Sequence, residues 1–276
     1  MAVINGTANN DTLIGTSGDD TIDPGANTGY DRIEGSAGND RIHFTSSTPQ
    51  SFYELVYFNL AGPITANIDF VANTGTVSKS GAGTDTLINP ARAVDSWTPT
   101  GDGMGLVGTT GNDSVTVNAL PGGWFGITGG EGVDIYSIVF TDSSTVRLDF
   151  SYGFGSNPTE GAYVDLAAQT IWNDGFGNQE TLSISGTAGL IEIQGTDNAD
   201  TLLGSEQNDR FRTRAGNDRI DGRGGSDEVR YDNSQITNLN LNLGNNQATF
   251  DWNGTSYTHT LTSIERARGS SGNDHL

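Results

Sequence analysis

The sequence predicts an all-β solenoid, a fold in which short parallel strands stack coil upon coil. Three observations support this prediction: a nine-residue repeat, a rich supply of turn residues and a lean supply of apolar residues. Glycine occupies 39 of the 276 positions, and hydrophobic residues make up 33% of the chain. That balance favours many short strands joined by turns over a helical bundle.

The repeat is clearest in two blocks. The first block covers residues 6–43, contains GTSGDDTID and GSAGNDRIH, and is interrupted by a two-residue insertion at Pro24-Gly25. The second block runs without a gap over residues 195–230. Isolated copies begin at residues 108 and 129, and the sequence stops inside a copy that begins at residue 269. A fixed period of this kind is typical of stacked solenoids.

Two positions of the repeat keep their character throughout. The sixth position is aspartate in all eleven copies: Asp11, Asp20, Asp31, Asp40, Asp113, Asp134, Asp200, Asp209, Asp218, Asp227 and Asp274. The eighth position is apolar: Leu13, Ile22, Ile33, Ile42, Val115, Tyr136, Leu202, Phe211, Ile220, Val229 and Leu276. We predict that the first six residues form a turn, in which Gly and Asn tolerate positive φ. The last three residues then form a strand whose middle residue faces a narrow core.

Two repeats complete one coil of about 18 residues, so every second repeat lies on the same edge of the solenoid. The predicted stacked pairs are Asp11 with Asp31, Asp20 with Asp40, Asp200 with Asp218, and Asp209 with Asp227. Stacked carboxylates repel one another unless a cation lies between them. Carboxylate and carbonyl oxygens are the ligands that Ca²⁺ prefers. The spacing therefore predicts calcium sites along the turns.

These nonapeptides resemble the G-G-x-G-x-D-x-U-x repeats of the RTX (repeats-in-toxin) family, which bind Ca²⁺ in β-helices. The resemblance implies a right-handed parallel β-roll in which aspartate carboxylates and turn carbonyls hold several Ca²⁺ ions between successive coils. Carried over by position, the ligands are the eleven sixth-position aspartates, with Asp20, Asp40, Asp200, Asp209, Asp218 and Asp227 the strongest. The accompanying glycines are Gly15, Gly18, Gly35, Gly38, Gly204, Gly216, Gly222 and Gly225.

Some copies depart from the family pattern. The first glycine is replaced by Ala26 and Thr213, and the fourth position holds Asn9, Asn198 and Gln207. We expect those turns to bind calcium less tightly or to hold water instead. Asp113 and Asp134 lack intact repeats on both sides, so they are weaker ligand candidates.

Three longer segments match one another: residues 64–89, 161–185 and 239–264. Each contains an alternating strand, a turn, a second strand and a tip of turn residues, followed by a Thr-Leu that re-enters a coil. We predict that they are wider, degenerate coils that bear hairpins and continue the roll. The chain then consists of one continuous solenoid of three related units, residues 1–107, 108–194 and 195–276, the last of them truncated.

Aromatic residues gather in and beside these segments: Phe52, Tyr53, Tyr57, Phe58, Trp97, Trp172, Phe176, Trp252 and Tyr257. Their general tendency to be buried favours a packing role in the wider coils. The alternative is an exposed platform for sugars, with the WNDGFGN tip at residues 172–178 as its best candidate.

Six arginines fall close together in the second block: Arg210, Arg212, Arg214, Arg219, Arg223 and Arg230. We expect them at outward positions of the repeat, where they screen the aspartates and discourage lateral association. The alternative is a stripe that binds a polyanion.

Several classes of function are disfavoured. A formal net charge of −21 argues against nucleic acid or anionic lipid as partners. The sequence has no cysteine, no apolar run near 18 residues that would insert into a membrane, and no recognisable signal peptide at its start. His43, His259 and His275 form no H-E-x-x-H motif, and there is no G-x-S-x-G motif. We therefore expect a protein that is not an enzyme.

The sequence favours a calcium-binding structural or adhesive module, whose folding is switched on when Ca²⁺ binds. The resemblance implies type I secretion from a bacterium, with a final location outside the cell or at the cell surface, where an adhesin or a surface layer would use such a module. The alternative function is a carbohydrate-binding or polysaccharide-modifying module, associated with an epimerase or lyase and partnered by extracellular polysaccharide. Because solenoids need capped ends, we also expect either a longer C-terminal region to follow Leu276 or a partner to cover that end.

Overall fold

The computed structural model describes residues 1–25, 29–45, 52–94, 103–119, 122–141, 143–151, 156–186 and 189–275. Strands dominate these residues, and the helical elements among them are two short 3₁₀ helices, η1 (Pro90–Ala93) and η2 (Leu243–Asn245). The all-β prediction is thus confirmed. The chain divides into two compact units, Met1–Arg147 with Leu182–Gly189, and Leu148–Thr181 with Leu190–Leu276. The division by sequence pattern into three related units stays a prediction.

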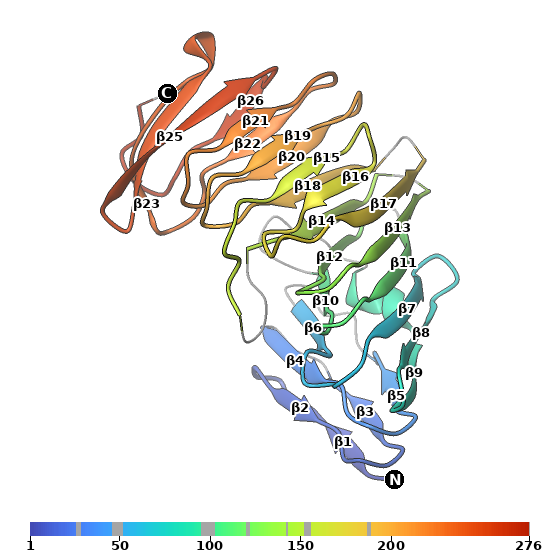
Figure 1. Cartoon of the computed structure of the whole chain (residues 1–276). Helices are drawn as coiled ribbons and strands as arrows, with labels where there is room; N and C mark the ends of the chain where they lie inside the picture. The colour runs from blue at the N-terminus through green and yellow to red at the C-terminus, as the bar shows by residue number, and fades with distance from the viewer. Residues whose placement is uncertain are drawn as a thin grey trace. The chain divides into compact units, whose positions relative to one another are not determined.

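The first unit contains strands of two sheets (Figure 1). One sheet has the order β1-β3-β5-β9-β8-β7-β11-β13, and the other has the order β2-β4-β6-β10-β12. The bounds in the first sheet are β1 (Val3–Asn5), β3 (Thr21–Asp23), β5 (Arg41–His43), β7 (Ile64–Asp69), β8 (Thr74–Lys79), β9 (Gly83–Ile88), β11 (Ser114–Ala119) and β13 (Ile135–Phe140). Those in the second are β2 (Thr12–Ile14), β4 (Tyr30–Glu34), β6 (Phe52–Val56), β10 (Gly103–Val107) and β12 (Trp124–Thr128).

The second unit has the same two-sheet design, with the orders β16-β15-β19-β21-β25-β24-β23 and β18-β20-β22-β26. The bounds in the first sheet are β15 (Tyr163–Asp165), β16 (Thr170–Asn173), β19 (Thr201–Leu203), β21 (Arg219–Asp221), β23 (Ile236–Asn242), β24 (Gln247–Trp252) and β25 (Thr255–Thr262). Those in the second are β18 (Leu190–Gln194), β20 (Asp209–Arg212), β22 (Glu228–Arg230) and β26 (Arg266–Arg268). Strands β14 (Thr145–Asp149) and β17 (Glu180–Ser185) each contain a boundary between the units.

The nonapeptide period produces this arrangement directly. Successive repeats contribute strands to the two sheets in turn, and every second repeat pairs in parallel register. Thr12 pairs with Arg32 in the first block, and Thr201 pairs with Arg219 in the second. The eighth-position residues among the described ones, such as Ile22 and Phe211, are buried, while Leu276 lies outside the described residues. The predicted stacking and the predicted core positions are therefore confirmed.

The segment at residues 64–89 enters one sheet as a three-stranded antiparallel meander. Ile64 of β7 pairs with Lys79 of β8, and Ser78 of β8 pairs with Thr84 of β9. The last strand, β9, pairs in parallel with β5, whereas the first strand, β7, pairs in parallel with β11. Strands β23, β24 and β25 form a second meander of this kind. The predicted hairpins are present, and the alternating burial of their strands lets each one lie within the sheet.

Aromatic rings fill the space between the two sheets where the meanders occur. In the first unit, Phe44 and Tyr53 have ring centroids 5.4 Å apart, and those of Phe70 and Phe125 are 5.3 Å apart. Tyr57 and Trp252 are also buried, so the packing role holds for them as well as for Tyr53. Burying one such side chain contributes about 1.5–3 kcal/mol, which matters in a core as lean as this one.

Candidate metal centre

The sixth-position aspartates form a hydrogen-bonded ladder along the turns, which we call the aspartate ladder. In each stacked pair, one carboxylate oxygen of the aspartate in the later coil accepts a hydrogen bond from the backbone N–H of the aspartate in the coil before it. The N···O distances are 2.9 Å for Asp20 N to Asp40 Oδ1 and 2.7 Å for Asp209 N to Asp227 Oδ1. Asp11 pairs with Asp31 and Asp200 with Asp218 in the same way, at 2.9 and 3.0 Å. All four predicted stacked pairs are present.

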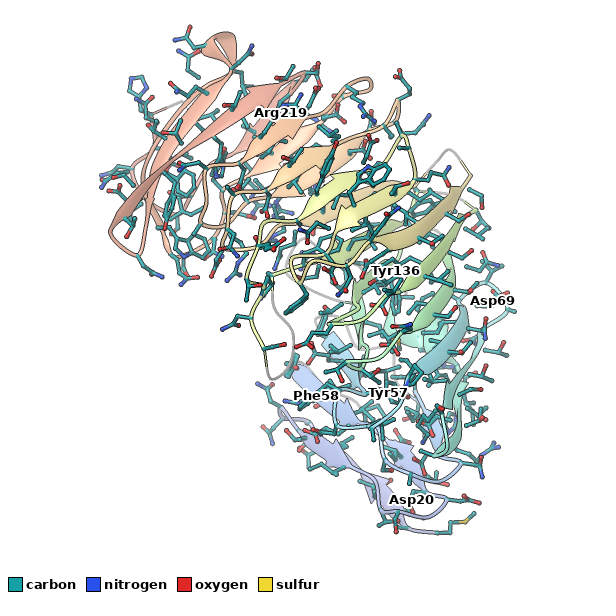
Figure 2. All side chains as sticks on the ribbon, viewed as in Figure 1. Asp20, Tyr57, Phe58, Asp69, Tyr136 and Arg219 are labelled. Carbon is teal, nitrogen blue, oxygen red and sulfur yellow. The ribbon has the colours of Figure 1, made fainter. Side chains whose placement is uncertain are left out.

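The second carboxylate oxygen usually closes its own turn. Asp20 Oδ2 accepts from the backbone N of Thr16 at 2.6 Å, and Asp209 Oδ2 accepts from that of Ser205 at 2.6 Å (Figure 2 labels Asp20). The hydroxyl of Ser205 adds a bond to the same Asp209 oxygen at 2.9 Å. The second position of the repeat is thus an anchor for the sixth, a role that its frequent Ser or Thr signals.

Burial separates the strong ladder members from the weak ones. Nine of the aspartates predicted as ligands are at most 2% exposed: Asp20, Asp31, Asp40, Asp113, Asp134, Asp200, Asp209, Asp218 and Asp227. Asp11 and Asp274, in the first and last copies, are only half-buried. A buried carboxylate is costly unless hydrogen bonds, a proton or a cation compensate its charge.

Asp113 and Asp134 are better placed than the sequence suggested. Asp113 N donates to Asp134 Oδ1 at 2.7 Å, and Ile64 N donates to Asp113 Oδ1 at 2.7 Å. The hydroxyl of Tyr136, which Figure 2 labels, donates to Asp134 Oδ2 at 3.1 Å. Although intact repeats do not flank them on both sides, β7 and β13 supply the neighbouring coils that intact repeats supply elsewhere. Their ranking as weaker ligands stays a prediction.

The first glycine of the repeat leaves a space lined with oxygen atoms. A Cβ at Gly204 would meet the carbonyl oxygen of Gly222 and Asp209 Oδ2, and a Cβ at Gly222 would meet the carbonyl oxygen of Ser263 and Asp227 Oδ2. A Cβ at Gly108 would likewise meet Asp113 Oδ2 of its own turn and the carbonyl oxygen of Gly129 in the next coil. At Gly35 the space is taken by the ring of Tyr57. We call this space at the first glycine the cradle. Where oxygen atoms line it, as at Gly204 and Gly222, the cradle offers the kind of ligand that Ca²⁺ prefers.

The fourth glycine has a backbone role instead. Gly38, Gly216 and Gly225 have φ of 104°, 108° and 108°, and a Cβ on each would collide with the backbone of the coil below. Gly18 is not in the left-handed region, and a Cβ on it would meet nothing within 4 Å. Within a stacked pair, glycine at this position is therefore required in the later turn.

Burial raises the proton affinity of the ladder in the second block. Desolvation raises the pKa of Asp209 to about 6 and that of Asp227 to about 7. The pKa values of Asp200 and Asp218 are raised for the same reason, and for Asp218 the neighbouring charge of Asp200 adds to it. Asp227 Oδ2 is buried without a hydrogen-bond partner among the described residues. These carboxylates need a positive charge to be stable in their ionised form at neutral pH.

The remaining ligands of an ion would come from the backbone. Across the described residues, no three acidic or histidine side chains gather at one point. The oxygen-lined cradles at Gly204 and Gly222 each offer one carboxylate oxygen and one carbonyl oxygen of the next turn. The residues present fit calcium at these two positions, with Asp209 and the carbonyl of Gly222 at one, and Asp227 and the carbonyl of Ser263 at the other.

The sequence profile of the RTX calcium-binding nonapeptide repeat, which comprises four copies, matches residues 3–28, 26–46 and 194–229. The chain carries RTX calcium-binding repeats. The matched residues lie in the two blocks that hold the stacked pairs, so these RTX blocks form a calcium-binding module. The isolated copies at residues 108 and 129 lie outside the matched ranges.

Other comparisons add little to the RTX match. No curated protein sequence matches the chain. Among solved structures, the chain is similar to the extracellular lipase LipA from Serratia marcescens, with 12% sequence identity over 91% of this chain and 37% of the lipase. The TM-score of that likeness is 0.19, too low to carry an argument about fold or activity. None of the described helices is long and apolar enough to cross a membrane.

Three further residues occupy rungs of the RTX ladder that the sequence did not reveal. Asp85, in SGAGTDTLI, stacks on Asp40, whose backbone N donates to Asp85 Oδ1 at 3.1 Å. Glu265 takes the rung after Asp227, whose backbone N donates to Glu265 Oε2 at 2.9 Å. His259 takes the rung after Asp218, with Nε2 3.1 Å from Asp218 Oδ2. Asp85 could have been found from its intact spacing, whereas Glu265 and His259 break the aspartate rule.

The arginines of the second RTX block pair mostly with acids outside the ladder. Arg210 bonds to Glu192 and Glu228, and Arg214 bonds to Asp197. Arg223 makes a two-pronged contact with Asp165 at 2.6 and 2.7 Å, and it also donates to the carbonyl oxygen of Gly204 at 2.9 Å. Most of them neutralise carboxylates outside the ladder. Burial raises the pKa of Asp209 and the charge of Arg223 partly lowers it again, so screening of the aspartates is seen at that position.

The WNDGFGN tip divides into a hydrogen-bonded loop and one exposed ring. Asp174 is buried and accepts from the backbone N of Phe176 at 2.8 Å and from that of Asn178 at 3.0 Å. Trp172 is 47% exposed, with its ring centroid 6.4 Å from that of Tyr163. Trp97 lies outside the described residues.

Proposed function

We propose that this chain is an extracellular structural or adhesive RTX module of a bacterial protein, whose folding is switched on by calcium after secretion. The coarser part of that statement, a calcium-binding module, follows from the repeats. RTX repeats are typical of secreted bacterial proteins. The proposal assigns no catalytic role to the chain.

One observation carries the proposal: the second block buries four stacked aspartates, and no lysine, arginine or histidine among the described residues forms an ion pair with Asp209 or Asp227. Both carboxylates are at most 2% exposed, and burial raises the pKa of Asp227 to about 7. Without a bound cation, the folded state must either protonate these groups or accept buried negative charge.

Calcium concentration then decides whether the chain folds. At the low calcium level of a cytosol, the ladder repels itself, and the lean core does not offset the entropy of ordering the chain. At the millimolar level outside a cell, ions bind the folded state and not the unfolded one, so their binding free energy adds to folding stability. A chain that stays unfolded until it leaves the cell is compatible with export in extended form.

Circular dichroism during a CaCl₂ titration tests the switch. We expect a gain of β structure as calcium is added and a return to the starting spectrum with EDTA. A spectrum that does not respond to either reagent would contradict the proposal.

The Asp227→Asn variant tests the ligand assignment. The amide of the substituted side chain keeps an acceptor for the backbone N–H of Asp209 but lacks the carboxylate charge, so we expect calcium affinity to fall at least tenfold, about 1.4 kcal/mol. Asp197→Asn is the matched control, because Asp197 belongs to the same block, is 53% exposed at its side chain and pairs with Arg214. Isothermal titration calorimetry should show the control within about twofold of wild type. Equal affinities for both variants would remove Asp227 from the ligand set.

A further inference from the structure

Lys79 is the one lysine in the sequence, and its side chain is completely buried. It extends from the end of β8 into the turn region between two rungs of the ladder, Asp40 and Asp85. A fully buried ammonium is rare unless it is paired. Its surroundings therefore indicate what it does there.

The ammonium of Lys79 donates to three oxygen atoms. It contacts the carbonyl oxygen of Ser36 at 2.5 Å, Asp40 Oδ2 at 3.3 Å and Asp85 Oδ1. These are one turn carbonyl and one carboxylate from each of two successive turns. An ammonium has three protons to donate, so all of them have an acceptor. We call these four residues the first junction, because they join the first block to the meander.

The acceptors of Lys79 are of the same kind as those lining the cradle at Gly222, where a carboxylate oxygen and the carbonyl oxygen of the next turn converge. The difference is that the first junction already contains a positive charge. The buried hydroxyl of Tyr57 also donates to Asp85 Oδ2 at 3.0 Å, so neither oxygen of Asp85 is left without a donor (Figure 2 labels Tyr57).

We propose that the first junction is a cation site of the ladder that is filled permanently by the Lys79 ammonium in place of a calcium ion. This inference rests on the proposed function, since it supposes that calcium fills other positions of the ladder. It follows that the junction between Asp40 and Asp85 holds together without calcium. It also follows that removing the lysine side chain opens a site for a divalent cation.

Two variants separate the charge of Lys79 from its bulk. Lys79→Ala removes both and leaves three oxygens facing a space that Ca²⁺ and water can fill. Lys79→Met fills most of the space with an apolar chain and leaves two buried carboxylates uncompensated. We expect Lys79→Ala to bind one more calcium ion per chain than wild type, and to regain stability in calcium. Lys79→Met should gain no ion, and calcium should not restore its loss in Tm.

Calcium stoichiometry by native mass spectrometry is the measurement for the whole chain. Wild type that binds no calcium at all would contradict the proposed function. Wild type that binds calcium, while Lys79→Ala gains no ion, would overturn the present inference and leave the proposed function standing.

Amine labelling of the wild-type chain gives an independent readout, which decides the matter even if Lys79→Ala does not fold. The chain has two amines, Lys79 and the N-terminus at Met1, which is 90% exposed. In the folded protein we expect reductive methylation at Met1 and protection at Lys79, with no loss of protection as calcium is raised. Labelling of Lys79 that increases with calcium would mean that calcium displaces the ammonium, and it would overturn the inference.

Discussion

The two blocks end in different ways. In the first junction, the rung after Asp40 is Asp85, and the ammonium of Lys79 lies between the two carboxylates. In the second block, the rung after Asp218 is His259, which is fully buried and stacked against Tyr231, whose hydroxyl lies 3.0 Å from His259 Nδ1. Burial lowers the pKa of His259 to about 3, so the imidazole is neutral at physiological pH.

The difference shows two ways of ending a column of buried carboxylates. The first junction adds an acid and a permanent cation together. The column of Asp200 and Asp218 adds neither, because the neutral imidazole of His259 stands where the next carboxylate would be, whereas the column of Asp209 and Asp227 continues to Glu265. Asp200 and Asp218 still lie below it with raised pKa values, so the second block depends on an external cation or on protons.

Calcium removal should give the largest difference between the second block and the first junction, measured as amide exchange. With EDTA, we expect amide exchange in β19, β20, β21 and β22 to accelerate at least a hundredfold, which corresponds to about 2.7 kcal/mol of lost protection. The amides that pair β5 with β9 should keep more of their protection, because Lys79 compensates that junction. Hydrogen exchange read by mass spectrometry measures both regions in one sample. Equal acceleration in both would break the comparison.

Acid should replace calcium in the second block. The folded-state pKa values of Asp209 and Asp227 are about 6 and about 7, above the ordinary value of 3.8, so the folded state binds protons more tightly than the unfolded state between pH 4 and pH 7. Stability without calcium therefore rises as pH falls from 7 to 5, by on the order of 2 kcal/mol.

Circular dichroism of the calcium-free chain from pH 7 to pH 5 checks this, with Asp209→Asn/Asp227→Asn as the control that should lose most of the response. In the first block, the hydrogen bond from the backbone N–H of Ala2 lowers the pKa of Asp20. The contribution of the ionised Asp20 to folding stability is therefore lost only as pH falls below the ordinary range of aspartate. A metal-free chain whose β structure is constant or declines toward pH 5 would contradict this account of the ladder.

The smallest of these effects concerns the backbone of one turn. Gly225→Ala places a Cβ on a residue with φ of 108°, against the carbonyl group of Gln207, and we expect a loss of about 1–3 kcal/mol. Gly18→Ala is the matched control, because it occupies the same position of the repeat in open space; its effect should be within about 0.5 kcal/mol. Urea unfolding in saturating calcium measures both. Equal costs would mean that the stacked turn relaxes to accept a side chain.

Much of the fold follows from the repeat because its signals are local and periodic. An aspartate and an apolar residue at a fixed spacing were enough to predict the stacking of Asp20 on Asp40 and the burial of Ile22 and Ile42. Two further features follow once two turns are placed one above the other. These are the oxygen-lined space at the first glycine and the steric clash that a Cβ at the fourth position would make with the backbone of the coil below.

The junctions could not be predicted in the same way, since they depend on which strands pair. Nothing in the sequence of residues 64–89 says that β9, and not β7, lies beside β5. A lone lysine in a polar strand is ordinarily taken as exposed. One signal was available: Lys79 follows Val77 at a spacing of two, so it shares the buried face of β8.

The strand order of the meander has a consequence for the kinetics of folding. Within the second block, contacts between successive rungs close loops of 18 residues, whereas Asp40 reaches Asp85 across 45 residues and Ile64 reaches Asp113 across 49. Loop-closure entropy makes the longer steps costlier by roughly 0.8 kcal/mol each. Coils inside a block can therefore form one after another through short-range contacts, whereas each meander requires strands that are distant in sequence to pair. In a chain that folds from one end, we expect the coils within a block to form quickly and the meanders to set the folding rate.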